Sequence, residues 1–391
     1  MWELILQFLN STGIVNFFQG DGWMNLIMIG VGAFFLFLAI KKKYEPYLLI
    51  PIAVGMILVN IFPAIYMTKN ADGEIIERGL LGYLHLGVEC ELYPCLIFIG
   101  IGATTDFGPL IANKKTMLLG AAAQIGIFAA FLGAIALSGI WPDVFNFTVG
   151  DAAGIGIIGG ADGPTAILVS NKLARPELTA GIALAAYSYM ALVPVIFPPI
   201  IKLCTTKKER SIRMETLKEV TKSEKILFPI IVTLICCILV PSCTPLIGCL
   251  MFGNLIKESG VVPNLVHTAS NALLYICTIL LGLSVGATAI GTTFLQAKTL
   301  MIFVLGILAF IVAAICGLMG GKLMCLITRG KVNPMIGAAG VSAVPMAARV
   351  VHKIGQEEDP DNYLLMHAMG PNVSGVIGSA IAAGILLSMI G

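Results

Sequence analysis

The chain has 391 residues, of which 58% are hydrophobic and 12% are Asp, Glu, Lys or Arg, and its formal net charge is +2. The charged share is about half that of a typical soluble protein, so the composition excludes a disordered protein, a coiled coil and a disulfide-rich secreted domain. It leaves a polytopic membrane protein, and the small net charge gives no indication of nucleic-acid binding.

Long apolar runs predict the membrane-spanning helices, because about 20 residues cross the hydrocarbon core. The long runs cover residues 26–40, 47–66, 117–141, 178–201, 226–240, 265–290, 300–327 and 364–390. Shorter or broken runs cover residues 79–111, 152–169, 246–256 and 335–350. We therefore expect an all-α polytopic membrane protein with about ten to twelve transmembrane elements.

Lysine and arginine residues predict the side on which each loop lies, since cytoplasmic loops are rich in them. Eight of the 24 Lys and Arg residues fall in the loop 202–225, which we expect in the cytoplasm. The run 117–141 then leads outward and the run 178–201 leads back. The segment 151–172 between them must begin and end outside, so we expect it to be a re-entrant, broken-helix hairpin.

Two pairs of segments indicate an internal duplication. Residues 96–117 resemble residues 278–300, since both carry a Gly-rich break and then Lys-Thr before a long apolar run. GGADGPTA at 159–166 resembles AGVSAVPMA at 339–347. The order is the same and the offset is nearly equal, as expected for two copies of one unit.

The second copy is expected to have the opposite orientation. With Lys322, Arg329 and Lys331 in the cytoplasm, a hairpin over residues 333–351 enters from the inside. Inverted repeats with broken helices are typical of transporters that bind ions near the middle of the membrane. We therefore divide the chain into an N-terminal segment with the first span (1–45), a first repeat (46–201), the cytoplasmic basic loop (202–225) and a second, inverted repeat (226–391).

Asp162 is the main candidate for an ion-binding residue. It lies in the middle of the first predicted hairpin, among five nearby glycines and before Pro164. A carboxylate at membrane depth costs about 3 kcal/mol or more, so such residues usually have a function. Glycines let backbone carbonyls approach a monovalent cation, and Pro164 leaves carbonyls free. The alternative is that Asp162 caps the helix starting at Gly163, and the two roles are compatible.

The second hairpin and the last span supply further polar candidates. Asn333, Ser342 and Asn372 carry neutral oxygens that could complete a sodium shell, and Asn372 follows a Gly-Pro break. Arg349 is a candidate for a buried cation. The alternative is that its side chain reaches to water at the mouth of the hairpin.

Three other residues have two interpretations each. Tyr187 and Tyr189 lie on an otherwise apolar helix before Pro194, and either anchor the chain at the membrane surface or present a hydroxyl to the site. Asp106 is compatible with a second intramembrane carboxylate and with the cytoplasmic interface.

The sequence also limits the possible energy sources for transport, because it lacks a motif for ATP hydrolysis. The phosphate-binding motif G-x-x-x-x-G-K-[ST] is absent, so a P-loop ATPase is not expected. From these residues alone, a sodium/proton antiporter or another sodium-coupled secondary transporter is the first expectation. A passive membrane anchor for a soluble enzyme is the other alternative, and the costly Asp162 argues against it.

Four long motifs resemble the β subunit of the sodium-pumping, biotin-dependent decarboxylases. They are GGADGPTAI (159–167), AAYSYMALVP (185–194), KVNPMIGAAGVSAVPMAARV (331–350) and HAMGPNVSGVIGS (367–379). The resemblance extends from about residue 80 to the last residue. This family acts on oxaloacetate, methylmalonyl-CoA, glutaconyl-CoA or malonate through a soluble carboxyltransferase, which chooses the acyl substrate.

The resemblance implies an activity and a set of partners. A β subunit of this kind decarboxylates carboxybiotin, consumes a proton and exports a sodium ion. Its partners are a soluble carboxyltransferase subunit, a biotin-carrier subunit, a small membrane subunit and the lipid membrane, with a homotrimer of the β chain. The cofactor is biotin carried by a partner, the transported ion is sodium, and the expected location is the bacterial inner membrane.

The resemblance also assigns roles to single residues. It implies that Asp162, Tyr189 and Arg349 are catalytic. Carboxybiotin would contact Arg349 and Gly337. The sodium ligands implied by the matching motifs are Asp162, Asn333, Ser342 and Asn372.

Overall fold

The apolar runs of the sequence form the helices of the molecule. The computed structural model describes residues 17–18, 20–70, 75–341 and 345–391, except the side chains of Lys69 and Ala191. Each of the eight long apolar runs contains one helix or a succession of helices, as predicted. The described part of the chain is almost entirely helical, which confirms the expected all-α fold.

The helices of the first half precede the basic loop. They are α3 (Trp23–Lys41), α4 (Pro46–Ile61), α5 (Leu80–Glu89), α6 (Leu92–Thr104), α7 (Gly108–Ala112), α8 (Met117–Ala123), α9 (Ile125–Ile140), α10 (Val149–Ile157), α11 (Gly163–Leu173) and α12 (Pro176–Cys204), with short 3₁₀ helices at Pro63–Ile65, Lys114–Thr116 and Ile158–Gly160.

The helices of the second half follow in a similar order. They are α13 (Lys207–Arg210), α14 (Lys222–Leu239), α15 (Thr244–Ser259), α16 (Pro263–His267), α17 (Leu274–Ala287), α18 (Gly291–Phe294), α19 (Ala297–Ile327), α20 (Met346–Glu358) and α21 (Leu365–Ile390). A π-helix over Thr268–Leu273 joins α16 to α17, and 3₁₀ helices lie at Pro241–Cys243 and at η6 (Pro334–Val341).

Length and hydropathy identify the spanning helices. Among the described residues, five helices are long and apolar enough to cross a membrane, and seven if each of two bent pairs is one span. One bent pair is α5 with α6, at 65°, and the other lies within α12, at 63°. The shorter apolar helices α4 and α10 with its 3₁₀ extension add to these, so the protein crosses the membrane several times.

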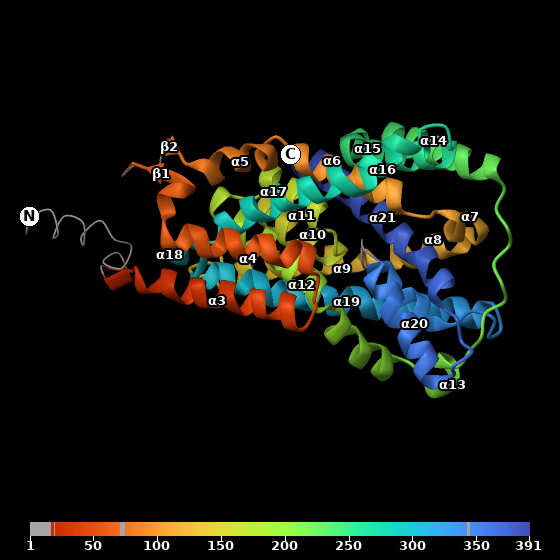
Figure 1. The fold of residues 1–391 in the computed structure, drawn as a ribbon. Helices are drawn as coiled ribbons and strands as arrows, with labels where there is room; N and C mark the ends of the chain where they lie inside the picture. Colours follow the sequence, from red (N-terminus) through yellow and green to blue (C-terminus); the bar gives the residue numbers. More distant parts are fainter. Residues whose placement is uncertain (1–16, 19, 71–74, 342–344) are drawn as a thin grey trace, which may run out of the picture.

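The two most polar parts of the chain lie at opposite ends of the molecule. The strands β1 (Met67–Lys69) and β2 (Ile75–Arg78) pair antiparallel at one end. The helix α13 lies at the other end, together with the extended chain that leads to α14 (Figure 1). The basic loop, which we expect in the cytoplasm, therefore lies at the end of the molecule away from this strand pair (Figure 1).

The segment predicted as the first hairpin folds as helix, break and helix. The helix α10 ends in the 3₁₀ turn Ile158–Gly160, and α11 begins at Gly163. The two open ends lie side by side, because a Cβ placed on Gly150 would overlap the carbonyl of Leu173. Every residue from Asp151 to Ser170 is buried, so this hairpin occupies the core of the bundle.

The second hairpin is longer than predicted. It consists of η6 and α20, and α20 continues to Glu358, whereas the prediction ended the hairpin at residue 351. The apolar run stops there, but the helix is amphipathic: Ile354 and Gly355 are buried while Lys353 and Glu357 are exposed. A mixed helix end of this kind gives no long apolar run in the sequence.

Two pairs of helices pack by the same reciprocal contact. In α4 and α17, a Cβ on Gly55 would overlap the carbonyl of Leu283, and a Cβ on Gly286 would overlap the carbonyl of Ile52. Glycine lets two backbones approach this closely.

The same pattern recurs between α6 and α15. A Cβ on Gly102 would overlap the carbonyl of Leu250, and a Cβ on Gly253 would overlap the carbonyl of Ile99. Each of these two interfaces joins one helix from before the basic loop to one helix from after it.

Candidate functional site

Asp162 lies at the break of the first hairpin, where the chain reverses. The preceding residue, Ala161, has φ 52°, a left-handed conformation that is uncommon for a residue with a Cβ. Asp162 has extended dihedral angles and occupies the N-cap position of α11, with Pro164 in the first turn. It is 1% exposed. Conformations of this kind are often found at functional sites.

The two carboxylate oxygens of Asp162 have different surroundings. Oδ2 accepts hydrogen bonds from Thr165 Oγ1 at 2.5 Å and from Ser379 Oγ at 3.0 Å. Oδ1 is buried and has no hydrogen-bond partner among the described residues. Asp162 therefore stands at the N-cap position, but its side chain makes no capping hydrogen bond to the backbone of α11, and one of its oxygens stays available for a ligand.

A tyrosine hydroxyl lies next to this break. The ring of Tyr187, on α12, packs directly on Gly163, because a Cβ placed on that glycine would overlap the ring. Tyr187 is 2% exposed. Its hydroxyl is also without a hydrogen-bond partner in the described part of the chain, which is unusual for a buried tyrosine.

The side-chain amide oxygen of Gln124 also lies near the break. Gln124 lies between α8 and α9, is 6% exposed, and donates from Nε2 to the carbonyls of Gly120 and Gly375 at 3.1 and 3.3 Å. Its Oε1 lies 3.6 Å from the position of a Cβ on Gly160. Within the described ranges this oxygen too is buried without a partner.

These side chains form an oxygen-rich site with a single carboxylate. Hard cations take oxygen ligands, and backbone carbonyls at a broken helix are typical sodium ligands in transporters. No group of three or more His, Cys, Asp or Glu side chains that could hold a metal ion occurs among the described residues. One negative charge among neutral oxygens fits a monovalent cation better than a divalent one.

Asn372 joins the second hairpin to α21. It is 2% exposed and its Nδ2 donates to the carbonyl of Ala339 at 3.1 Å. Ser379 follows it by two helical turns on the same face of α21, about 10 Å further along. The helix thus contacts η6 through Asn372 and Asp162 through Ser379. Ser342, which was expected nearby, lies outside the described residues.

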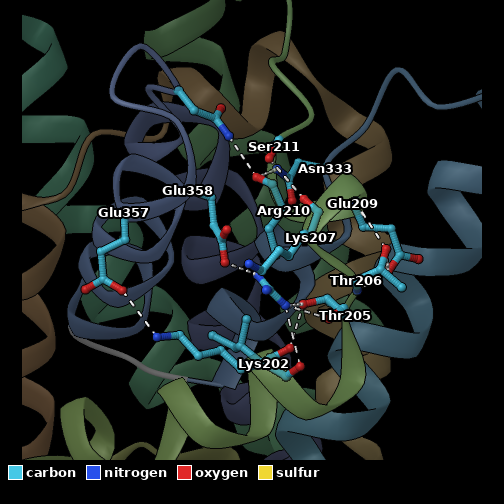
Figure 2. Close-up of polar contacts among 12 residues, drawn as sticks. Lys202, Thr205, Thr206, Lys207, Glu209, Arg210, Ser211, Asn333, Glu357 and Glu358 are labelled. Atoms are coloured by element: carbon cyan, nitrogen blue, oxygen red, sulfur yellow. Dashed lines mark hydrogen bonds and ion pairs between the residues drawn. The ribbon is translucent and has the colours of Figure 1, made fainter.

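Asn333 is engaged with the basic loop. Its Nδ2 donates to the carbonyls of Arg210 and Ile212, both at 3.0 Å, and its Oδ1 accepts from the backbone N–H of Met335. Figure 2 shows Asn333 beside Arg210 and Ser211. Both amide hydrogens and the amide oxygen of this side chain are therefore used at the start of the second hairpin.

Tyr189 faces α19 instead of Asp162. Its hydroxyl donates to the carbonyl of Phe303, and its ring packs edge-on against Phe303 and Phe310. Tyr187 and Tyr189 are two residues apart and so point to different sides of α12. Of the two tyrosines considered from the sequence, Tyr187 lies against the break that carries Asp162.

The structure also places the three remaining candidate residues, which are Gly337, Arg349 and Asp106. Gly337 packs on Gly317 of α19 with backbone against backbone. Arg349 is exposed on α20, so the interpretation as a buried cation is wrong and the alternative at the mouth of the hairpin agrees with the structure. The side chain of Asp106 is 42% exposed, pairs with Lys225 at 3.5 Å and accepts a hydrogen bond from the N–H of Gly108. Asp106 therefore lies outside the core, which favours the interpretation at the cytoplasmic interface.

Comparison with known proteins shows the family. A model of the family described as the Na⁺-transporting oxaloacetate decarboxylase beta subunit matches residues 24–390. The chain belongs to this family.

Members with three different names are about equally similar to this beta subunit. The methylmalonyl-CoA decarboxylase subunit beta of Propionigenium modestum is 51% identical, with full coverage of both chains. The glutaconyl-CoA decarboxylase subunit beta of Acidaminococcus fermentans is 52% identical over 98% of this chain and 96% of its own. The oxaloacetate decarboxylase beta chain of Klebsiella pneumoniae is 49% identical over 95% and 98%.

Three residues of the site in this decarboxylase beta subunit were not predicted. Thr165 and Ser379 donate to Asp162, and Gln124 presents an unpaired oxygen near it. Thr165 was detectable as a hydroxyl three residues after a helix cap. Gln124 was detectable as the one amide in the apolar run 117–141. Ser379 stands within a quoted motif, but no local pattern pointed from it to Asp162.

Proposed function

We propose that this membrane subunit exports sodium and that decarboxylation of carboxybiotin, presented by a biotin-carrying partner, drives the export. The family description contains the words Na⁺-transporting and decarboxylase, and the relatives' names contain the word decarboxylase. Both support this proposal. The observation that carries the proposal at residue level is Asp162, which is fully buried with one oxygen unpaired among the described residues.

The chemistry of Asp162 supports coupling between sodium and a proton. A buried carboxylate is stable only when something neutralises it. A sodium ion at Oδ1 and a proton on the carboxyl group both do so, and they exclude each other. Decarboxylation of carboxybiotin converts an N-carboxylate and a proton into an N–H and CO₂. A site that exchanges a sodium ion for the proton would therefore link the reaction to ion movement.

The shared intermediate explains the similarity to three kinds of decarboxylase. The identities of 51%, 52% and 49% to chains named for different acyl-CoA or oxaloacetate substrates do not favour one of them. We propose that this chain acts on carboxybiotin and that a soluble carboxyltransferase chooses the acyl substrate. A biotin carrier, a small membrane subunit and two further copies of this chain complete the proposed complex.

Arg349 is a candidate for the contact with carboxybiotin. It is exposed on α20 near the basic end of the molecule. Burial raises the pKa of the Glu45 carboxyl, and the nearby charge of Arg349 opposes this rise in part. An exposed guanidinium can meet the carboxylate of an incoming ligand. We propose that Gly337 is a glycine because only a residue without a side chain lets η6 pack closely on α19.

We also propose that the two halves are inverted repeats. Leu283 and Gly286 follow Ile99 and Gly102 by 184 residues, and Leu250 and Gly253 follow Ile52 and Gly55 by 198. The contact between α4 and α17 thus recurs with the two copies exchanged, between α15 and α6. A two-fold relation between two copies of one unit produces this exchange. With the basic loop in the cytoplasm, the two hairpins would enter from opposite sides.

The test uses Asp162→Asn in the purified complex. Asn keeps the shape of the side chain but has no charge to bind sodium, so we expect loss of sodium-stimulated decarboxylation and of sodium uptake into proteoliposomes. Asp143→Asn, at an exposed acid, is the matched control. Sodium-stimulated turnover by Asp162→Asn would refute the proposal. Sodium uptake by this chain alone, driven by a proton gradient, would instead favour an antiporter.

A further inference from the structure

The open end of the first hairpin is closed by residues at its start and directly after its end. Asp151, at the start of α10, is fully buried, and it accepts from the backbone N–H and the guanidinium of Arg175, which follows α11, at 2.7–2.8 Å. Thr148 and Asp151 also cap α10 reciprocally. We refer to the Asp151–Arg175 contact as the first clamp.

The second hairpin is closed by a different part of the chain. Asn333 begins this hairpin as Asp151 begins the first, but Asn333 donates to the carbonyls of Arg210 and Ile212. From the far end of the hairpin, Asn362 Nδ2 donates to the same carbonyl of Arg210 at 2.9 Å. Both ends of the second hairpin therefore meet on one residue of the basic loop.

The side chain of Arg210 completes this contact. It is 6% exposed, and its Nε donates to Glu358 Oε1 at 2.7 Å and its Nη1 to the carbonyl of Thr205 at 2.6 Å (Figure 2). Glu358 is the last residue of α20. We refer to Arg210, Asn333, Glu358 and Asn362 as the second clamp.

Exposed ion pairs surround the second clamp. Lys202 pairs with Glu357 at 3.3 Å, and Arg213 pairs with Asp359 at 2.6 Å. The side chains of Lys202, Glu357 and Arg213 are about half exposed. Exposed pairs contribute little, whereas breaking a buried pair leaves a charge without compensation. Arg210 is therefore the residue on which the attachment of the loop depends.

A continuous set of contacts leads from the second clamp to Asp162. Asn333 begins η6, and η6 accepts a hydrogen bond from Asn372 through Ala339. Asn372 and Ser379 lie on α21, and Ser379 donates to Asp162. The loop also continues directly from α12, the helix that carries Tyr187. Energetic coupling along these contacts is measured as a change in the sodium requirement when Arg210 is changed.

We propose that Arg210 is a positioning residue, which holds both ends of the second hairpin to the basic loop and thereby sets the affinity of the site at Asp162 for sodium. The inference rests on the proposed function in one respect, the binding of sodium at Asp162. The two clamps differ: the first joins Asp151 to Arg175, which follows the same hairpin directly, while the second depends on the basic loop, which lies more than a hundred residues before the second hairpin. Displacement of that loop would release the second hairpin only.

The experiment compares Arg210→Gln with Arg213→Gln in the purified complex. Hydrogen exchange of the amides in η6 and α20 reports on the hairpin, and a sodium titration of decarboxylation reports on the site. For Arg210→Gln we expect faster exchange in both elements and a sodium requirement about tenfold higher, within the usual range of coupling between sites, with the rate at saturating sodium largely kept. Arg210→Lys retains the charge and is expected to be intermediate, and Arg213→Gln to resemble the wild type.

Two results would overturn the inference. One is wild-type exchange in η6 and α20 for Arg210→Gln. The other is faster exchange with an unchanged sodium requirement, which would limit Arg210 to a structural role. If Arg210→Gln does not fold, Glu358→Gln tests the same contact from the other side.

The same measurements separate this inference from the proposed function. Asp162→Asn is expected to lose the response to sodium and to keep wild-type exchange in η6. A retained sodium response in Asp162→Asn would refute the proposed function, whereas the exchange of Arg210→Gln would still report on the second clamp.

Discussion

Ser379 Oγ lies 3.0 Å from Asp162 Oδ2, although 217 residues separate the two positions in the chain. The contact joins the first hairpin to the last helix of the protein. It also fixes one oxygen of the carboxylate, so that the other oxygen keeps a defined direction. The response of sodium binding to changes at Ser379 therefore tests the geometry of the site.

Ser379→Ala removes one of the two hydroxyl donors to Asp162. A hydrogen bond to a charged group contributes about 1.5–3 kcal/mol, so the ionised carboxylate, to which we propose sodium binds, loses stability. We expect the sodium concentration for half-maximal decarboxylation to rise about tenfold or more. Ser388→Ala is the control, because Ser388 lies on the same helix, is exposed and donates to the carbonyl of Ile385. An unchanged sodium requirement in Ser379→Ala would contradict the site.

The two tyrosines of α12 are expected to differ in what their hydroxyls do. Tyr187→Phe removes a buried hydroxyl without a described partner, so we expect unchanged thermal stability and a sodium requirement several-fold higher. Tyr189→Phe removes the hydrogen bond to the carbonyl of Phe303, so we expect a loss of about 0.5–1.5 kcal/mol in the free energy of unfolding. Thermal unfolding and sodium titration of both variants check this. Loss of decarboxylation in Tyr189→Phe at wild-type stability would instead support the catalytic role implied by the family resemblance.

The reciprocal glycine contacts predict equal effects at related positions. Gly102→Ala and Gly286→Ala each place a methyl group against a backbone carbonyl of another helix. Overpacking of this kind costs about 1–3 kcal/mol, and we expect similar losses of thermal stability in the two variants. A Cβ on Gly139 would meet no described atom within 4 Å, so Gly139→Ala should be neutral or stabilising. Clearly unequal losses would argue against the repeat.

Low pH is expected to weaken the exposed ion pair between Arg213 and Asp359, which lies beside the second clamp. The hydrogen bond from Arg213 holds the pKa of the Asp359 carboxyl below its usual range. A lowered pKa in the folded state means that the stabilisation is present above the unfolded pKa, near 3.9, and is lost as the pH falls through the folded value. We expect constant amide protection in residues 210–213 from pH 8 to about 5 and a decrease below about 4. Asp359→Asn should remove this pH dependence, and its persistence would exclude Asp359 as the cause.

The sequence predicted the helices and singled out Asp162 as the candidate site residue. Apolar runs predicted every long helix, because a segment in lipid must be apolar along its length. Asp162 stood out because a carboxylate among glycines at membrane depth is costly, and the structure places it in the core with only hydroxyl partners among the described residues. The break at Ala161 and Asp162 agrees with the Gly-rich pattern around it.

Contacts between distant segments were not predictable. Asn333 has the residue type of a sodium ligand, but its partners are backbone carbonyls of a loop more than a hundred residues earlier. Tyr187 and Tyr189 are indistinguishable as residues on one apolar helix, and only packing against Gly163 and Phe303 separates them. Arg349 had two interpretations, a buried cation and a side chain that reaches to water, and only the structure shows that the exposed side of the amphipathic α20 carries it.

The left-handed conformation of Ala161 has a consequence for ion selectivity. A residue with a Cβ keeps φ 52° only where its surroundings impose it, and all of its neighbours in the hairpin are buried in close packing. The carbonyls at this turn are therefore fixed before an ion arrives. At the proposed sodium site, a turn held in this way has little freedom to widen for a larger ion, so we expect lithium to stimulate decarboxylation more than potassium does.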